Sequence, residues 1–282
     1  MRSAFVLLRT LGDVILGNTL VKEIREQTSE IDYLCWFINK EYENIPKNNP
    51  YINSLFFPDD WDDVLLELIK NKYDKVFIPY QTQHTDTYWH QTSEYGNLHL
   101  LDFYALRCRI KIKDRKLLMF PDDKDFEKVK DFKDKKYIII HTTTGVPTKD
   151  WDLNKFNILS SRLKDSEFRI IQVGSKNDKP LKDIDLDLRD KLTFTEITAL
   201  LKDCYCFVGL DSGISYLAGA SGCKSIVLQG STIPVTSGPF TQNIIHIVSE
   251  TGCQPVRCHA NCEKGNPCIN SIDVNTVFDK VI

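Results

Sequence analysis

The chain has 282 residues, with 36 basic against 39 acidic side chains and a formal net charge of −3. A hydrophobic share of 42% and a charged share of 27% are those of a folded protein, and exclude a disordered or collagen-like chain. The length suits roughly two domains. The slightly acidic balance argues against a dedicated nucleic-acid binder, which normally carries a strong basic excess.

The chain begins with a short apolar run, residues 4–9, which we interpret as a buried strand. Apolar residues at helical spacing from Val14 to Ile24 follow it. Arg9 and Asp13 interrupt the run too early for a secretory signal, and no stretch approaches the roughly 18 apolar residues of a membrane span. We therefore expect a cytoplasmic protein, with at most peripheral contact at the inner face of the cytoplasmic membrane.

Strand-like apolar runs then alternate with helical patterns, which is typical of βαβ units with a parallel sheet. Further strands are expected at 33–38, 55–57, 75–78, 137–141, 168–173, 205–210 and 225–229. Helices are expected at 153–164, 195–202 and 214–221. The predicted fold class is α/β, with two Rossmann-like domains at 1–134 and 135–282. The last helix is a candidate to pack back on the N-terminal domain.

In open α/β sheets, ligands bind beyond the carboxyl ends of the strands, so the loops after strands are the places to look for chemistry. The first such loop contains Gly12 and Asp13. Asp13 either caps the helix that follows or serves as a carboxylate that accepts a proton from a substrate hydroxyl.

The loop from His141 to Trp151 has three consecutive threonines and a lysine after a buried strand. Hydroxyls, backbone N–H groups and a lysine charge suit a phosphate, which makes Thr143, Thr144 and Lys149 candidate ligands. Alternatively, the threonines satisfy the backbone of their own loop. Trp151 is expected in the core rather than against a base.

A third loop ends a strand at Gly209 and opens a helix at Asp211, Ser212 and Gly213. A pyrophosphate can rest on such a helix N-terminus. Asp211 or Ser212 can also cap the helix, and the two roles are compatible. A fourth loop, residues 230–240, consists mainly of small residues and is placed to close over a ligand.

Taken in order, these loops resemble one family, the heptosyltransferases of glycosyltransferase family 9. The matching segments are the strand, Arg and Gly-Asp of 5–16, the Asn-Pro-Tyr-Ile turn at 49–52, the His-to-Lys-x-Trp loop at 141–151, the Asp-Ser-Gly helix start within 209–218, Ser-Gly-Pro-Phe at 237–240 and the cysteine-rich tail. The chain departs from the family pattern at Tyr216, where His is usual, and at Leu20, where Pro is usual.

The resemblance implies a GT-B architecture, in which an acceptor-side domain and a nucleotide-sugar domain face each other across a cleft. It implies inverting transfer of a heptose, or a related sugar, from an ADP-sugar donor to a lipopolysaccharide-core or similar glycan, lipid-linked or not. Asp13 takes the role of general base. The resemblance assigns the donor diphosphate to Thr143, Thr144, Lys149, Asp211, Ser212 and Gly213. No cofactor is expected for catalysis, so Lys149 and the helix N-terminus stabilise the leaving group.

Four cysteines crowd the tail: Cys253, Cys258, Cys262 and Cys268. Their C-x4-C-x3-C-x5-C spacing favours a metal over disulfides in a cytoplasmic protein, although it is not the paired spacing of a zinc ribbon. A structural zinc or iron and a set of reduced thiols both stay open. The other five lie mostly in apolar runs and are expected to be buried: Cys35, Cys108, Cys204, Cys206 and Cys223.

The polar segment 81–99 contains His84, Trp89, His90 and His99 and is either an acceptor-binding loop or a packed surface loop. Two other classes of function stay open: a sugar-nucleotide epimerase on the GT-B scaffold, and a catalytically silent module that binds a nucleotide or glycan. A dehydrogenase is disfavoured, because no G-x-G-x-x-G opens either half at a first strand.

Overall fold

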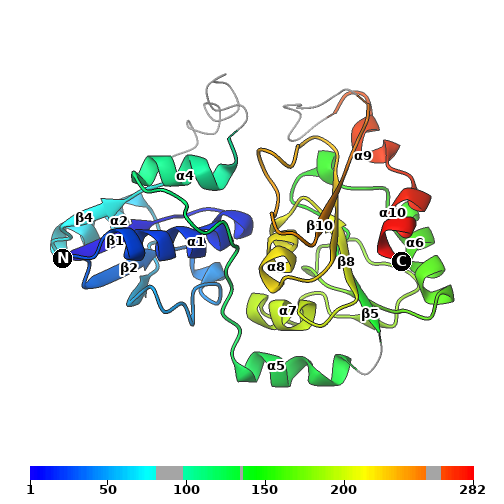
Figure 1. Cartoon of the computed structure of the whole chain (residues 1–282), viewed down its shortest axis with the longest axis horizontal. Coiled ribbons are helices and arrows are strands. Elements are labelled where there is room, and N and C mark those ends of the chain that lie inside the picture. Colours follow the sequence, from blue (N-terminus) through cyan, green and yellow to red (C-terminus); the bar gives the residue numbers. More distant parts are fainter. Residues whose placement is uncertain (81–97, 134–135, 252–261) are drawn as a thin grey trace. The chain divides into compact units, whose positions relative to one another are not determined.

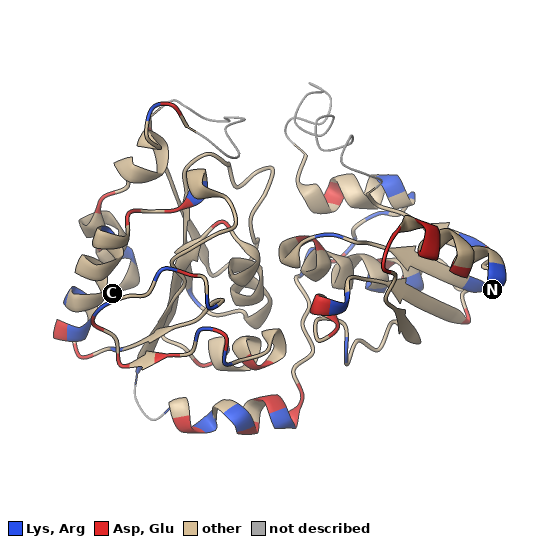
Figure 2. Cartoon of the chain, turned by 180° about the vertical axis from the view of Figure 1, so that it is seen from behind, with Lys and Arg blue, Asp and Glu red and all other residues tan. Residues whose placement is uncertain are grey.

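The computed structural model describes residues 1–80, 98–133, 136–251 and 262–282. The chain divides into two compact units, Met1–Phe120 and Pro121–Ile282. In the described residues each unit is built around one parallel sheet with helices packed on it, so the predicted α/β class is confirmed (Figure 1). Figure 2 shows that basic and acidic residues are interspersed along the ribbon of both units.

The sheet of the first unit has the order β3-β2-β1-β4, and all its strands are parallel. Its strands are β1 (Arg2–Val6), β2 (Tyr33–Phe37), β3 (Ser54–Phe56) and β4 (Lys75–Phe77). The helices are α1 (Leu11–Gln27), the short η1 (Lys40–Tyr42), α2 (Trp61–Lys70) and α4 (Leu100–Cys108). The strand order reverses between β1 and β4, which makes the loops beyond these two strands the expected ligand position.

Helix α1 is held close to the sheet by its apolar residues and by one glycine. The side chains of Val14, Leu20 and Ile24 are fully buried. A Cβ atom on Gly17 would lie 2.5 Å from the ring of Trp36 on β2, so only glycine allows this approach. The close packing places the start of α1 at the carboxyl end of β1.

The sheet of the second unit has the order β10-β9-β8-β5-β6-β7, again all parallel. Its strands are β5 (Tyr137–Ile140), β6 (Arg169–Gln172), β7 (Leu186–Asp187), β8 (Cys206–Leu210), β9 (Ser225–Gln229) and β10 (Ile244–Val248). Counted from β5, this is the 3-2-1-4-5-6 order of dinucleotide-binding folds, and it reverses between β5 and β8.

The remaining elements belong to the second unit as well. The helices are α5 (Asp123–Val129), η3 (Lys130–Phe132), η4 (Pro147–Lys149), α6 (Leu153–Asp165), α7 (Phe194–Leu201), α8 (Gly213–Ser221), α9 (Pro267–Ser271) and α10 (Val274–Val281). None of the helices within the described ranges is both long enough and apolar enough to cross a membrane.

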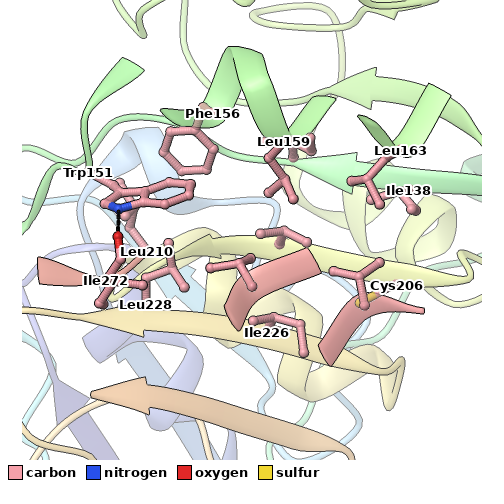
Figure 3. Packing of buried hydrophobic residues seen from close by; sticks show 14 of the residues in the cluster. Ile138, Trp151, Phe156, Leu159, Leu163, Cys206, Leu210, Ile226, Leu228 and Ile272 are labelled. Atoms are coloured by element: carbon pink, nitrogen blue, oxygen red, sulfur yellow. Dashed lines mark hydrogen bonds between the residues drawn. The ribbon is translucent and has the colours of Figure 1, made fainter. Parts of the chain in front are cut away.

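The core of the second unit joins the sheet to α6 and the C-terminal tail (Figure 3). Trp151 is 1% exposed and packs edge-on against Phe156, with 4.8 Å between ring centroids. Its Nε1 donates a hydrogen bond of 3.0 Å to the carbonyl oxygen of Ile272 in the tail. The expectation that Trp151 is a core residue is confirmed.

The division between the units lies earlier than the expected boundary after residue 134. Helix α5 packs against α7, where the buried carboxylate of Asp125 accepts a hydrogen bond of 3.0 Å from the hydroxyl of Thr195. The Nζ of Lys133 donates a hydrogen bond of 2.6 Å to Oδ2 of Asp203. These contacts hold the charged segment before β5 to the second unit. Helix α10, the candidate to pack back on the first domain, packs on α6 and β9 within the second unit.

Candidate active site

Asp13 lies in the first turn of α1, just beyond β1 at the point where the strand order reverses. Its Oδ1 accepts a hydrogen bond of 2.6 Å from the hydroxyl of Tyr104 on α4. Its Oδ2 accepts from both the backbone N–H (3.3 Å) and the hydroxyl (2.7 Å) of Thr10, the N-cap residue. Since the carboxylate is only 6% exposed, these three bonds fix its orientation.

The bonds with Thr10 show that Asp13 does contribute to capping, because the helix start needs partners for its N–H groups. They engage Oδ2, whereas among the described residues Oδ1 accepts the hydrogen bond from Tyr104. A carboxylate offers about four acceptor positions in all, so Oδ1 retains capacity for another donor. Capping and proton acceptance are therefore compatible. The Nε of Arg9 adds positive charge 3.7 Å from Oδ2, and its guanidinium stacks on Tyr80.

In the second unit, the threonines after β5 shape their own loop. The hydroxyl and the backbone N–H of Thr144 both bond Asp150 Oδ1, at 2.9 and 2.7 Å. Thr142 donates to the carbonyl oxygen of Lys179 at 2.7 Å, and the Thr143 hydroxyl accepts from the Lys179 N–H at 2.9 Å. The threonines thus bond groups of the protein itself, as the alternative to phosphate binding predicts. Phosphate binding by Thr143 and Thr144 stays a prediction.

Lys149 and Asp211 form an ion pair between the loops that follow β5 and β8. The Nζ of Lys149 lies 2.8 Å from Oδ2 of Asp211, and the side chains are 19% and 4% exposed. The Thr232 hydroxyl donates to the same oxygen at 2.7 Å. Burial alone would raise the pKa of Asp211, but Lys149 and Thr232 hold it below its ordinary value. Asp211 is consequently a carboxylate at neutral pH.

Ser212 and Gly213 form the N-terminus of α8 beside this ion pair. Ser212 is the extended N-cap residue, and Gly213 is the first helical residue. Both are half-buried rather than covered. The first N–H groups of a helix have no partner within the helix and carry partial positive charge, so this end suits an anion. Lys149 adds a full charge next to it, held there by Asp211.

The small-residue loop 230–240 is tied to α8 and to the ion pair. Besides the Thr232 bond, the backbone N–H of Gly238 donates to the hydroxyl of Tyr216 at 2.8 Å. Gly238 has φ +106°, which only glycine adopts easily. His246 on β10 lies 3.1 Å from the carbonyl oxygen of Pro239, and burial lowers its pKa.

Tyr104 and His141 contact predicted site residues, and Asp178 contacts His141. Tyr104 was missed because nothing local in its helix marks it as a partner of Asp13. His141 and Asp178 form a buried pair, with Nε2 of His141 3.1 Å from Oδ2 of Asp178. Nδ1 of His141 lies 3.2 Å from the hydroxyl of Ser212. An acid shortly after the strand at 168–173 was the signal that could have found Asp178.

The predicted metal ligands are described only in part. Cys253 and Cys258 lie outside the described residues, whereas Cys262 is half-buried and Cys268 is buried. Among the residues that the structure describes, no group of three or more His, Cys, Asp or Glu side chains is arranged to hold a metal. The structural metal therefore stays a prediction. The five scattered cysteines are all buried, as expected.

Most of the candidate acceptor segment 81–99 also falls outside the described ranges, including His84, Trp89 and His90. His99 is described: it is the N-cap residue of α4, and its Nδ1 accepts a hydrogen bond of 3.1 Å from the N–H of Leu101.

Comparison with known proteins places these features in a family. The model of glycosyltransferase family 9 (heptosyltransferase) matches residues 71–266. The chain is 23% identical to lipopolysaccharide heptosyltransferase 1 of Campylobacter coli, in an alignment that covers 100% of this chain and 98% of the relative.

Two solved structures show the same fold. The ADP-heptose lipopolysaccharide heptosyltransferase II of Escherichia coli has a TM-score of 0.78 at 13% identity, covering 100% of this chain and 97% of that one. The dodecameric iron-containing heptosyltransferase TibC of enterotoxigenic E. coli, in complex with ADP-D-beta-D-heptose, has a TM-score of 0.73 at 16% identity, covering 99% and 75%. With its model matched over most of the sequence, the chain belongs to glycosyltransferase family 9 (heptosyltransferase) and is a glycosyltransferase.

Proposed function

We propose that the protein transfers a heptose, or a closely related sugar, from an ADP-sugar donor to a lipopolysaccharide-core or similar glycan, with inversion at the anomeric carbon. Membership of glycosyltransferase family 9 supports sugar transfer. The name of the C. coli relative supports a lipopolysaccharide acceptor, and the TibC complex supports an ADP-heptose donor.

The observation that carries the proposal is the position of the polar groups in the two sheets. Asp13 lies beyond β1, where the strand order of the first unit reverses. Lys149 and the start of α8 lie beyond β5 and β8, where the order of the second unit reverses. Ligands of doubly wound sheets bind at such points. The first unit thus offers a proton acceptor, and the second offers an anion site.

In the proposed reaction, Asp13 is the general base. The acceptor hydroxyl gives its proton to Oδ1 of Asp13 while its oxygen forms a bond to the anomeric carbon of the donor sugar. The bond between that carbon and the β-phosphate oxygen breaks, and ADP leaves with the bonding electrons. Tyr104 and Thr10 hold the carboxylate in place. A positioned base of this kind contributes roughly 10²–10⁴ to the rate.

The leaving diphosphate gains negative charge in the transition state, and Lys149, Ser212 and Gly213 are the groups that we assign to it. Asp211 has a different role from the one implied by the family resemblance. Its carboxylate would repel a diphosphate, whereas its bond of 2.8 Å to Lys149 keeps the ammonium group next to α8. We therefore infer that Asp211 positions Lys149. Loss of one preorganised donor to a developing anion costs roughly 10²–10³ in rate.

The test is release of ADP from ADP-heptose in the presence of a truncated lipopolysaccharide acceptor. Asp13→Asn removes the base and keeps the shape, so kcat should fall by roughly 10²–10⁴. ADP affinity should stay the same, because the donor groups lie in the second unit. Asp165→Asn, an exposed carboxylate at the end of α6, is the matched control and should leave kcat unchanged.

Undiminished transfer by the Asp13→Asn enzyme would show that the base is another residue. Conversion of a UDP-sugar without any acceptor would instead identify an epimerase. Nucleotide binding without turnover in the wild-type protein would identify a silent module.

A further inference from the structure

Helix α2 presents a row of large apolar side chains to solvent. Trp61, Leu65 and Ile69 follow one another at intervals of four residues, and they are 37%, 53% and 74% exposed. Leu66, beside Leu65, is 64% exposed. Residues three or four apart are neighbours on the surface of a helix, so these four side chains form one apolar surface. The proposed transfer reaction does not use it.

The other side of α2 fixes the helix to the sheet of the first unit. Val64 is fully buried and packs in one cluster with Cys35 and Phe37 of β2. Helix α1, which carries Asp13, instead approaches Trp36 of the same strand. Because successive side chains of a strand point to opposite faces of the sheet, α1 and α2 cover opposite faces. The apolar surface of α2 therefore lies on the face opposite to the helix of the proposed base.

Charged residues of opposite sign flank this apolar surface at the two ends of the helix. Asp62 lies in the first turn and Lys70 in the last, and both are exposed. Asp60 and Asp63 accept hydrogen bonds from backbone N–H groups around the helix start. Asp62 and Lys70 thus give the exposed face of α2 a negative and a positive end.

The arrangement of this face complements itself. It consists of two columns of residues spaced four apart: Trp61, Leu65 and Ile69, and beside them Asp62, Leu66 and Lys70. A two-fold axis level with the two leucines reverses the helix direction. It places Trp61 against Ile69 of the second copy, and Asp62 against Lys70 of the second copy. A parallel pair would place like charges together, so the complementarity exists only in an antiparallel pair.

We propose that this face of α2, the α2 face, pairs with the same face of a second copy of the chain in an antiparallel two-fold dimer. Such an interface uses one patch on both copies, which is the commonest symmetry of soluble oligomers. The inference is independent of the proposed function, because it involves neither the proposed base nor the proposed anion site.

The charges favour a second copy over a membrane as the occupant of the α2 face. Helices that lie on anionic lipid surfaces carry Lys and Arg on their polar side, since the surface potential is negative. Residues 59–63 contain four aspartates, which such a surface would repel. A second copy, by contrast, offers both an apolar partner surface and the opposite charge at each end.

The short length of α2 sets the expected strength of the dimer. A helix of 10 residues is about 15 Å long, so two paired α2 faces bury less than a standard interface of about 1,600 Å². Interfaces below about 1,200 Å² are typical of transient complexes. We therefore expect a reversible dimer with a Kd of about 1 µM or weaker.

The experiment is sedimentation velocity of the full-length protein in reducing buffer at loading concentrations from about 1 to 500 µM, chosen to span the expected Kd. The weight-average sedimentation coefficient should rise with concentration. The Leu65→Gln/Ile69→Gln protein should stay monomeric, and its Tm should show that it folds, because both side chains are exposed and glutamine suits a helix. Ile158→Gln on α6 is the matched control, since Ile158 is also 53% exposed, and it should dimerise like wild type.

Charge reversal tests the pairing of Asp62 with Lys70. Asp62→Lys and Lys70→Asp each place like charges together, and the two-fold axis makes the loss occur twice. Each single variant should therefore raise the Kd by roughly two- to thirtyfold. The double variant Asp62→Lys/Lys70→Asp should restore the wild-type Kd. Single variants that dimerise like wild type, or a double variant as weak as the singles, would contradict the antiparallel pairing.

Disulfide trapping tests the position of the axis. In the antiparallel pair the two copies of position 66 lie nearly level, whereas the two copies of position 69 lie roughly 9–12 Å apart along the helices. A disulfide needs Cα atoms within about 7 Å. With diamide as oxidant, Leu66→Cys should give a linked dimer above the background of the wild-type cysteines, and Ile69→Cys should not. A linked dimer of the Ile69→Cys protein alone would contradict the arrangement.

A sedimentation coefficient that stays constant at every concentration would overturn the inference. Dimerisation that persists in the Leu65→Gln/Ile69→Gln protein would overturn it as well, because the contact would then lie elsewhere. Binding of a monomeric protein to phosphatidylglycerol vesicles, lost in the same variant, would assign the α2 face to a membrane instead. None of these results bears on sugar transfer, since no residue of this face belongs to the proposed active site.

Discussion

Variants of the ion pair between Lys149 and Asp211 can separate its contribution to stability from its contribution to ADP binding. The side chain of Asp211 is 4% exposed. In the Lys149→Ala protein, the Thr232 hydroxyl would still donate a hydrogen bond to the Asp211 carboxylate. Removing one partner of a buried pair costs about 3–5 kcal/mol. Because Lys149 is 19% exposed and the Thr232 bond remains, we expect the lower end, about 3 kcal/mol.

This loss is large enough to measure by calorimetry or urea unfolding. A domain of 150–250 residues loses roughly 2–4 °C of Tm per kcal/mol, so the transition of the second unit should fall by about 6–12 °C. The pH dependence follows from the lowered pKa of Asp211. Its stabilisation is present above the unfolded pKa of about 3.9 and is lost as pH falls through the folded value. The Lys149→Ala protein should lack this acid-sensitive component.

The double variant Lys149→Ala/Asp211→Asn separates the two roles. It leaves no uncompensated buried charge, so most of the lost stability should return, to within about 1 kcal/mol of wild type. The ADP affinity should stay at least about tenfold below wild type, because the ammonium group is still missing. Recovery of ADP affinity in the double variant would refute the reasoning. So would a Lys149→Ala protein with wild-type stability.

Two further predictions concern single hydrogen bonds. Tyr104→Phe removes the donor 2.6 Å from Oδ1 of Asp13, so kcat should fall about tenfold while the KM for ADP-heptose stays the same; a change in KM alone would show that Tyr104 affects binding instead. Trp151→Phe loses the bond to Ile272 and part of the core volume, and urea unfolding should show a loss of about 2–4 kcal/mol. A loss under about 0.5 kcal/mol would contradict the packing argument for Trp151.

The order of strands and helices was predictable because each βα unit leaves a strong local pattern. The fully buried run at β5 and the helical spacing of α1 mark their elements without reference to the rest of the chain. Lys149 and Asp211 were candidates for the same reason, since Asp211 follows β8 directly and Lys149 lies in the loop after β5. The apolar run of β10 was equally readable and was omitted.

Contacts between distant segments were not predictable in the same way. Tyr104 reaches Asp13 across 91 residues because α4 packs beside α1, and no periodicity within α4 indicates this partner. The spacing in the sequence also did not show that Asp211 pairs with Lys149, so it did not distinguish this pairing from binding of the diphosphate. The charged segment before β5 was placed with the first domain because its own composition does not show that α5 packs on α7.

The most direct test of the account is a thermal-shift titration of the protein with ADP, GDP, UDP and CMP at matched concentrations. A ligand that binds only the native state adds about 2.7 kcal/mol at 100 times its Kd, which is a readable shift. The account predicts stabilisation by ADP above the other three, and a smaller shift by ADP in the Lys149→Ala/Asp211→Asn protein. Stabilisation by UDP in place of ADP, or by no nucleotide, would contradict it.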